Sequence, residues 1–352
     1  MRALTRFPYL RDALTRIPTH YISRLRLESP GGESLTLRSE TPAALMIRRV
    51  EFDHLLVRLA VEAGAELIEG VEIAQAAMAS SGVTLVARDG RVLSAPLVIA
   101  ADGVHSVTAR RLGFNLGWPA RSIALDMMEE TPNDSLCAVE PETLWVSYSH
   151  GGSDGYAYVF PKRDHVNVGI GCLLSYYRGQ VRQPPYDLQR QLVDSLRETG
   201  VLRGASSRRY FTPFLIPVGG PLRQTVRERV LVVGDAGGFV NGFSAEGIYY
   251  AMVSGSLAAE AVLHGEPHAY ESRWRRECGA ELRDAVWVQQ YLFADATRVD
   301  AMVKGAHRYP SIASGLVDYA TGGRSYWNAR WRLIARLPFV AARVALTAPN
   351  LA

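Results

Sequence analysis

Hydrophobic and polar residues alternate near the start of the chain, and the period then changes. Residues 22–27 alternate, the glycine pair 31–32 follows, and the alternation resumes over 35–38. Two alternating runs joined by glycines predict a β-hairpin. Over 52–63 the apolar residues recur three and four positions apart, which predicts an amphipathic helix. Gly64 is expected to end this helix.

Two apolar runs end abruptly in an aspartate. The three runs after the helix predict strands at 65–73, 83–86 and 97–101. The last of these leads directly into Asp102, and a second continuous apolar run, 230–233, leads into Gly234 and Asp235. A buried parallel strand has this pattern, and its carboxyl end brings polar groups to a ligand crevice. Asp102 and Asp235 are therefore candidate site residues.

Residues 118–215 follow a different pattern. Stretches of period two, at 143–147 and 156–160, are followed by one helical pattern over 186–199. These features predict an antiparallel sheet with one helix, which forms a separate layer. A helix rich in small residues is predicted over 247–261.

The fold class expected from these patterns is α/β (α+β), with a parallel-sheet domain interrupted by an antiparallel one. We expect the parallel-sheet domain to consist of residues 1–116 and 216–265. The antiparallel sheet domain should span 117–215, and a C-terminal helical region should span 266–352.

Composition excludes several classes of protein. With 48% hydrophobic and 21% charged residues, the 352-residue chain is a folded globular protein and not a disordered or fibrous one. The net charge of +4 is mild and its cations are interspersed with acids, so no nucleic-acid partner is expected. The cysteines have no metal-binding spacing, and no signal peptide or spanning segment is recognisable, so a cytoplasmic location is expected. The cysteines are Cys137, Cys172 and Cys278.

The segment after the second apolar run favours a nucleotide-like cofactor. Gly234 and Gly237 let the backbone approach a ligand closely, and a helix opening near Gly247 presents free N–H groups to negative charge. Asp235 can accept a hydrogen bond from a ribose or ribityl hydroxyl. The alternative is that these glycines only pack a helix on a strand, and for one motif alone both interpretations stay open.

Two groups of motifs together resemble a known family. Asp102-Gly103-x-x-Ser106 and Gly234-Asp235-Ala236-Gly237 resemble the C-terminal flavin fingerprints of the FAD-dependent para-hydroxybenzoate-hydroxylase-like superfamily. Within it, Tyr156-Ala-Tyr158-Val-Phe160-Pro161-Lys162 resembles the Tyr-x-Trp-x-Phe-Pro-Lys element of the geranylgeranyl reductase family, with Tyr in place of Trp. The resemblance covers about residues 20–265 and implies an FAD-binding parallel sheet with an inserted substrate-domain sheet.

The resemblance also implies roles for individual residues. Asp235 would bond FAD hydroxyls, and the N–H groups of Gly247 and Ile248 would face the flavin pyrimidine oxygen. Arg49 would lie near the diphosphate, although a solvated arginine is an equal alternative. The cofactor residues implied are Asp235, Gly234, Ala236, Gly237, Gly247, Ile248, Asp102, Gly103 and Arg49. The substrate residues implied are Tyr156, Tyr158, Phe160, Pro161 and Lys162, whose aromatics would otherwise be core.

Two departures from the family pattern stand out. The family's Asn-Pro-x-x-Gly-Glu-Gly segment is Asn-Gly-Phe-Ser-Ala-Glu-Gly over 241–247. No G-x-G-x-x-G unit is present, because Leu174 replaces the third glycine after Gly169 and Gly171. We therefore expect the first βαβ unit to be missing, with the start of the chain placed too far downstream, and we expect exposed sheet edges and weak FAD binding.

The function expected is that of an FAD-dependent oxidoreductase that saturates prenyl double bonds with electrons from NAD(P)H or another donor. A flavin monooxygenase and a remnant that binds no flavin are the alternatives. No residue is identified as the proton donor, since lone side chains are usually structural; those considered are Glu246, His165, Cys172, Tyr249 and Tyr250. Neither a metal nor an oligomeric state is predicted. The basic, apolar segment 328–343 would either contact a membrane surface or dock on the flavin domain.

Overall fold

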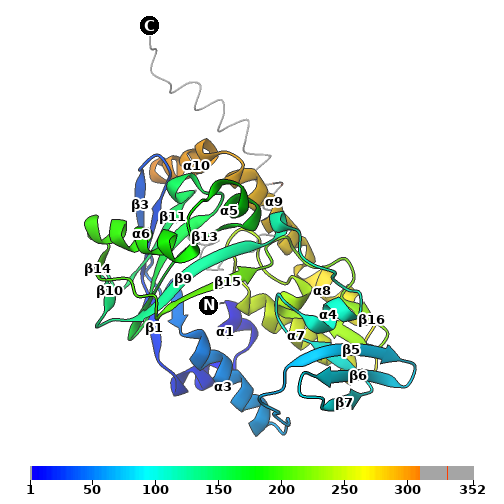
Figure 1. The fold of residues 1–352 in the computed structure, drawn as a ribbon. Helices are drawn as coiled ribbons and strands as arrows, with labels where there is room; N and C mark the ends of the chain where they lie inside the picture. Colours follow the sequence, from blue (N-terminus) through cyan, green and yellow to red (C-terminus); the bar gives the residue numbers. More distant parts are fainter. Residues whose placement is uncertain (1, 310–330, 332–352) are drawn as a thin grey trace.

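The computed structural model describes residues 2–309 and residue 331 (Figure 1). A large sheet forms one half of the molecule, and a small mixed sheet with helices forms the other. The basic segment 328–343 lies outside the described residues, apart from Trp331. Within the described part of the chain, every helix is too short or too polar to cross a membrane, and no cluster of side chains is suited to a metal ion.

The large sheet has seven strands in the order β15-β9-β13-β12-β11-β2-β3. All neighbours are antiparallel except β11 and β2. The strands are β2 (Arg24–Glu28), β3 (Ser34–Arg38), β9 (Ala124–Pro132), β11 (Thr143–Tyr148), β12 (Tyr156–Pro161), β13 (His165–Leu173) and β15 (Phe211–Ile216). The predicted antiparallel sheet is therefore present.

The predicted N-terminal hairpin is confirmed, but it lies in this same large sheet. Strands β2 and β3 pair antiparallel around residues 29–33. Leu25 and Leu27 alternate with polar residues and are buried against α9 (Ala280–Phe293). The large sheet thus takes strands from both sides of residue 117, because β2 pairs with β11 and α9 covers the apolar face of both strands.

The small sheet confirms the two predicted parallel strands. Strand β17 (Val230–Val232) pairs parallel with β8 (Val98–Ala100) and antiparallel with β16 (Val226–Arg227). Strand β17 is completely buried, with Leu231 packed among residues of α7 (Ile248–Leu263) and α8 (Ala269–Trp274) and Val232 packed with Ala109. Strand β8 is an edge strand, and its Ile99 is 38% exposed.

A third sheet corrects one expectation. The strand predicted at 65–73 is wrong, since residues 65–72 form neither helix nor strand and the strand β5 spans Ile73–Ala79. Leu67 and Ile68, which suggested it, are about half exposed and reach no core. Strand β5 pairs with β6 (Gly82–Ala87), and β7 (Val92–Ala95) completes a meander that the sequence pattern did not reveal.

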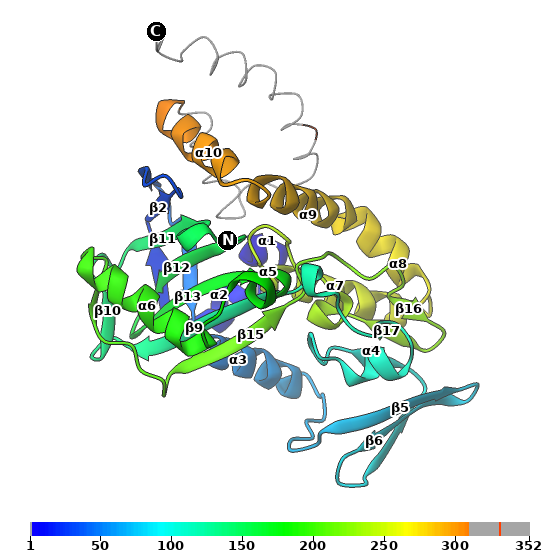
Figure 2. The ribbon, with the colours of Figure 1, turned by 45° about the horizontal axis from the view of Figure 1, so that its top comes forward.

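Helices cover both faces of the large sheet (Figure 2). Helix α6 (Pro185–Glu198) packs Leu192 and Val193 on one face, and α9 packs on the other. Because side chains alternate along a strand, residues 157 and 159 of β12 face α6, while 156, 158 and 160 face α9. The aromatic residues of the family-like element therefore share the α9 side of the sheet.

The remaining elements connect these layers. The predicted helix at 52–63 is confirmed as α3, and Gly64 follows with φ of 99°. The other helices and strands are α1 (Arg2–Arg6), α2 (Leu10–Ala13), β1 (Thr19–Ile22), β4 (Ala44–Ile47), α3 (Arg49–Glu62), α4 (Val107–Arg111), β10 (Leu136–Ala138), α5 (Leu174–Gln180), β14 (Leu202–Gly204) and α10 (Ala296–Arg308). Short 3-10 turns lie at Leu14–Arg16, Ala120–Ser122, His150–Gly152 and Gly234–Gly237, and a π turn spans Arg275–Gly279.

Candidate functional site

A cavity of about 450 Å³ lies between the α9 side of the large sheet, strand β4 and the loop that leads into α7. Its wall brings together several residues that the sequence singled out: Arg49, Tyr156, Tyr158, Phe160, Lys162, Gly247 and Ile248. Other predicted site residues do not line it: Asp102, Gly103, Gly234, Asp235, Ala236, Gly237 and Pro161. The cavity thus joins the family-like element of β12 to the N-terminus of α7.

Three aromatic rings of β12 form one side of this cavity. Tyr158 stacks on Phe160 with 4.3 Å between ring centroids, and Tyr156 lies tilted at 6.2 Å from Tyr158. The hydroxyl of Tyr156 donates to the carbonyl of Ser244, 2.7 Å away. Tyr158 is buried, Tyr156 and Phe160 are partly buried, and all three rings are part of the cavity wall.

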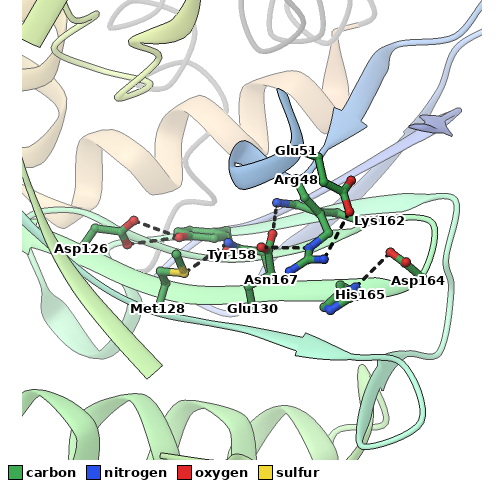
Figure 3. Close-up of polar contacts among 10 residues, drawn as sticks. All are labelled: Arg48, Glu51, Asp126, Met128, Glu130, Tyr158, Lys162, Asp164, His165 and Asn167. Carbon is green, nitrogen blue, oxygen red and sulfur yellow. Dashed lines mark hydrogen bonds and ion pairs between the residues drawn. The ribbon is translucent and has the colours of Figure 1, made fainter. Parts of the chain in front are cut away.

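Asp126 of β9 faces the same cavity (Figure 3). The hydroxyl of Tyr158 donates to its Oδ1 and Oδ2 atoms, at 3.2 and 3.0 Å. Burial raises the pKa of Asp126 to about 6, and the hydrogen bond from Tyr158 opposes this rise only in part. A carboxyl group that titrates near neutral pH in a cavity is suited to acid–base chemistry.

A charged cluster lies at the other end of β12 (Figure 3). The ammonium of Lys162, which is 8% exposed, bonds the carboxylate of Glu130. Arg48 also donates to Glu130, at 3.2 Å, and to Glu51, at 3.3 Å. Burial lowers the pKa of Lys162, while the charge of Glu130 raises it. The two cations and two carboxylates balance, so the cluster is a structural network between the sheet and α3 as well as one end of the cavity.

The sequence reasoning missed the β9 side of the site. Asp126, Met128 and Glu130 lie on one side of β9, with Asp126 in the cavity wall, and Asn167 of β13 donates to the sulfur of Met128 at 3.2 Å. The available signal was a pair of acids four positions apart, which lie on the same side of a strand. That signal does not say which face of the strand is covered by α9, because the position of α9 is set by the tertiary structure.

The residues after β17 carry polar groups of the kind that the expected FAD would need. No hydrogen bond reaches the Asp235 carboxylate within the described part of the chain, and burial raises its pKa while the charge of Arg49 lowers it. A Cβ at Gly247 would lie 3.3 Å from Asp235 Oδ1, so the carboxylate and the helix start are adjacent. No side chain caps α7, whose first N–H groups have no partner within the helix. Asp235, Gly247 and Ile248 therefore offer acceptors and donors to FAD.

Asp102 has a different local role. Its carboxylate accepts hydrogen bonds from the hydroxyl of Ser106 and from the backbone N–H of Thr108, 3.0 Å away. Ser106 in turn caps α4 by accepting from the N–H of Ala109. Gly103 adopts a φ of 77° in this turn. The Asp102 motif thus holds the turn between β8 and α4.

The exchanged glycine in the loop 241–247 has a physical reason. A Cβ at Gly242 would lie 2.8 Å from the carbonyl oxygen of Val218 and 3.0 Å from Val286 Cα. Any side chain larger than a hydrogen atom would collide there with the Val218 carbonyl and with helix α9. Asn241 holds the loop, since its Oδ1 accepts from the N–H groups of Phe243 and Ser244, both at 3.0 Å.

The other candidate acids and nucleophiles lie in different parts of the structure. His165 pairs with Asp164 at the end of the sheet (Figure 3), and Tyr250 is completely buried in the core. Burial raises the pKa of the Cys172 thiol to about 12. Glu246 lines the cavity and burial raises its pKa, while the charge of Arg2 lowers it.

Two relatives of known name resemble this chain in sequence. It is 29% identical over 298 residues to digeranylgeranylglycerophospholipid reductase 2 of Methanothermobacter thermautotrophicus. The match covers 79% of this chain and 74% of that protein. It is 31% identical over 232 residues to the chloroplastic geranylgeranyl diphosphate reductase of Nicotiana tabacum. This match covers 62% of this chain and 47% of that protein.

Solved structures share the fold. A geranylgeranyl bacteriochlorophyll reductase-like protein of Thermoplasma acidophilum superposes with a TM-score of 0.68 at 20% identity, over 81% of this chain and 75% of that one. A flavin-dependent brominase superposes with a TM-score of 0.69 at 14% identity, over 97% and 87%. These likenesses confirm the expected fold class, that of FAD-dependent oxidoreductases. Residues 13–253, well over half of the chain, match the FAD binding domain family, and the chain therefore belongs to that family.

Proposed function

We propose that this protein is an FAD-dependent reductase that saturates carbon–carbon double bonds of a prenyl lipid. The observation that carries the proposal is the cavity that joins the aromatic wall of β12 to the N-terminus of α7. The names of the sequence relatives, which are prenyl reductases, support the same substrate class.

The residues after β17 would hold the cofactor. Asp235 would accept from FAD hydroxyl groups, and the N–H groups of Gly247 and Ile248 would donate to the flavin ring. Arg49, whose charge reaches Asp235, would lie near the diphosphate. Gly234, Ala236 and Gly237 would leave room for close approach of the backbone. Bound FAD, once reduced, supplies a hydride to carbon.

The cavity suits an apolar substrate. Besides the three rings of β12, apolar side chains from β4, from the loop 242–247 and from α9 line it: Leu45, Met46, Phe243 and Phe293. A prenyl chain needs burial more than hydrogen bonds, and such a wall provides it. NAD(P)H is the electron donor that we propose, and the basic segment 328–343 would bring the protein to a membrane surface that holds the lipid.

The test uses the purified 352-residue chain loaded with FAD and reduced anaerobically with dithionite. Incubation with geranylgeranyl diphosphate should give products that gain two hydrogen atoms for each saturated bond, detected by mass spectrometry. Stoichiometric bound flavin without any saturated product would contradict the proposal. NAD(P)H-dependent oxygen insertion into an aromatic probe would instead favour a monooxygenase, and a folded chain that retains no flavin would favour a non-catalytic remnant.

A further inference from the structure

Asp126 differs from the other acids of the cavity in its surroundings. Its side chain is partly buried, and its carboxyl group opens onto the cavity. Gly171, its cross-strand neighbour, has no side chain to cover it, and a Cβ there would lie 3.9 Å from Asp126 Oδ1. Within the described residues Asp126 makes no ion pair, and Tyr158 is the side chain that bonds it.

The groups that face Asp126 are neutral near pH 7. They are Tyr156 and Tyr158 of β12 and Cys172 of β13. Burial raises the pKa of each, to about 12 for Cys172 and well above the usual range for Tyr158. No neighbouring charge therefore fixes Asp126 as a carboxylate.

The other cavity acids are engaged elsewhere. Asp154 accepts a hydrogen bond from the backbone N–H of Leu173 at 2.9 Å and so holds the end of β13. Glu130, which lies outside the cavity wall, is bonded to Lys162 and Arg48. Glu246 also lines the cavity, but the charge of Arg2 favours its ionised form and opposes the effect of burial on its pKa.

We propose that Asp126 is the general acid that protonates the prenyl double bond, and that the Tyr158 hydroxyl stabilises the carboxylate this leaves. The proposal rests on the proposed function. It stands on the position of the carboxyl group in the cavity wall, on its hydrogen bonds to Tyr158 and on the lack of an ion-pair partner within the described residues.

The chemistry balances as follows. Saturation of one double bond requires one hydride, which the reduced flavin supplies, and one proton. The hydride pair forms one C–H bond, and the π electrons form the second C–H bond with the proton as the Asp126 O–H bond breaks. The products are a saturated bond, oxidised flavin and the Asp126 carboxylate, which accepts the Tyr158 hydrogen bond and regains a proton from water.

Two variants separate a catalytic acid from a structural one. Asp126→Asn keeps the shape and the acceptor for Tyr158 but has no acidic proton. Tyr158→Phe keeps the ring but removes the hydrogen bond that stabilises the carboxylate, so the pKa of Asp126 should rise. Asp164→Asn, an exposed aspartate in the turn after β12, is the control.

Four measurements follow on FAD-loaded protein reduced with dithionite, with geranylgeranyl diphosphate as the probe: bound flavin, reoxidation by oxygen, the pH profile of saturation, and infrared spectra of the carboxyl groups. We expect Asp126→Asn to keep bound flavin and reoxidation while saturation falls by about 10²–10⁴-fold. In the wild type the rate should fall as pH rises through about 6, and Tyr158→Phe should move this fall to higher pH. A protonated carboxyl band that disappears over the same range should be missing in Asp126→Asn.

The outcomes distinguish the two proposals. If the wild type saturates the probe and Asp126→Asn does so within about threefold of its rate, the assignment of Asp126 is overturned and the proposed function stands. A Tyr158→Phe profile that does not move, or a wild-type infrared spectrum without the titrating band, overturns it as well. If the flavin-loaded wild type saturates no prenyl probe, the proposed function fails and Asp126 loses its role with it.

Discussion

The ring of Tyr158 lies against Gly169, its cross-strand partner on β13. A Cβ at Gly169 would come within 2.5 Å of the Cζ and hydroxyl oxygen of Tyr158 and within 2.9 Å of Met128 Cβ. The missing side chain on one strand thus makes room for the ring on the next, and it directs the hydroxyl toward Asp126.

Gly169→Ala should therefore disturb the packing of the Tyr158 ring in the cavity wall. The added methyl group has no space, so we expect a loss of about 1–3 kcal/mol in the free energy of unfolding. Urea unfolding followed by circular dichroism measures it. Gly179→Ala in α5 is the control, because a Cβ there meets nothing within 4 Å and should stabilise the helix slightly. Equal stability of both variants would contradict the close packing of Tyr158 on Gly169.

Ala245 occupies a position where the family pattern has glycine, and its φ is 55°. The strain of an L-residue in the left-handed region is about 1–2 kcal/mol. Glycine removes this strain but loses more conformational entropy on folding, so the net gain in stability is smaller. Ala245→Gly should raise the free energy of unfolding by about 0.5–1 kcal/mol. Ala60→Gly on the exposed side of helix α3 should lower it by about 1 kcal/mol. Thermal unfolding of the two variants should therefore shift in opposite directions.

Asp126 should make stability depend on pH. Its folded-state pKa of about 6 lies above its ordinary value of 3.8, so folding penalises the ionised form. The contribution is fully favourable below about pH 4 and is lost as pH rises through about 6. Relative to Asp126→Asn, the wild type should lose on the order of 2–3 kcal/mol over this window. Parallel thermal melts from acid to neutral pH measure the difference, and a constant difference would refute the shift.

The Lys162–Glu130 pair should show strong coupling. Lys162→Met leaves the Glu130 carboxylate with Arg48 alone, so a loss of about 1–3 kcal/mol is expected. The double variant Lys162→Met/Glu130→Gln should regain at least half of that loss, since no uncompensated carboxylate remains. Chemical unfolding of the single and double variants gives the coupling, and additive losses would show that the pair is not energetically linked.

The two aspartates that follow parallel strands should behave differently. Asp235→Ala should weaken FAD binding by about 10–100-fold, because it removes an acceptor for cofactor hydroxyls. Asp102→Ala should instead cost about 1 kcal/mol of stability by releasing the turn before α4, with a smaller effect on FAD. Equilibrium dialysis with FAD and thermal melts separate the two effects. Equal loss of FAD in both variants would argue against this division of roles.

Much of the fold follows from local pattern. The alternation in 22–38, the helical spacing before Gly64 and the two apolar runs before Asp102 and Asp235 each predict the element that is present. At 65–73 the apolar pattern predicts a strand that is absent, and Leu67 and Ile68 are about half exposed there. Hydrophobicity alone cannot tell a buried apolar residue from an exposed one in a short segment.

By itself, the sequence determined the family-like motifs, the elements that carry them and the aromatic residues of β12, because these depend on local periodicity and on residue type. Three contacts depend on the tertiary structure: the Tyr158 hydroxyl donates to Asp126, Glu130 pairs with Lys162, and Asp102 holds a turn. These contacts join residues on separate strands or depend on a turn's geometry. They are set by strand register and by which face of the sheet α9 covers, and neither is encoded in the spacing of any one segment.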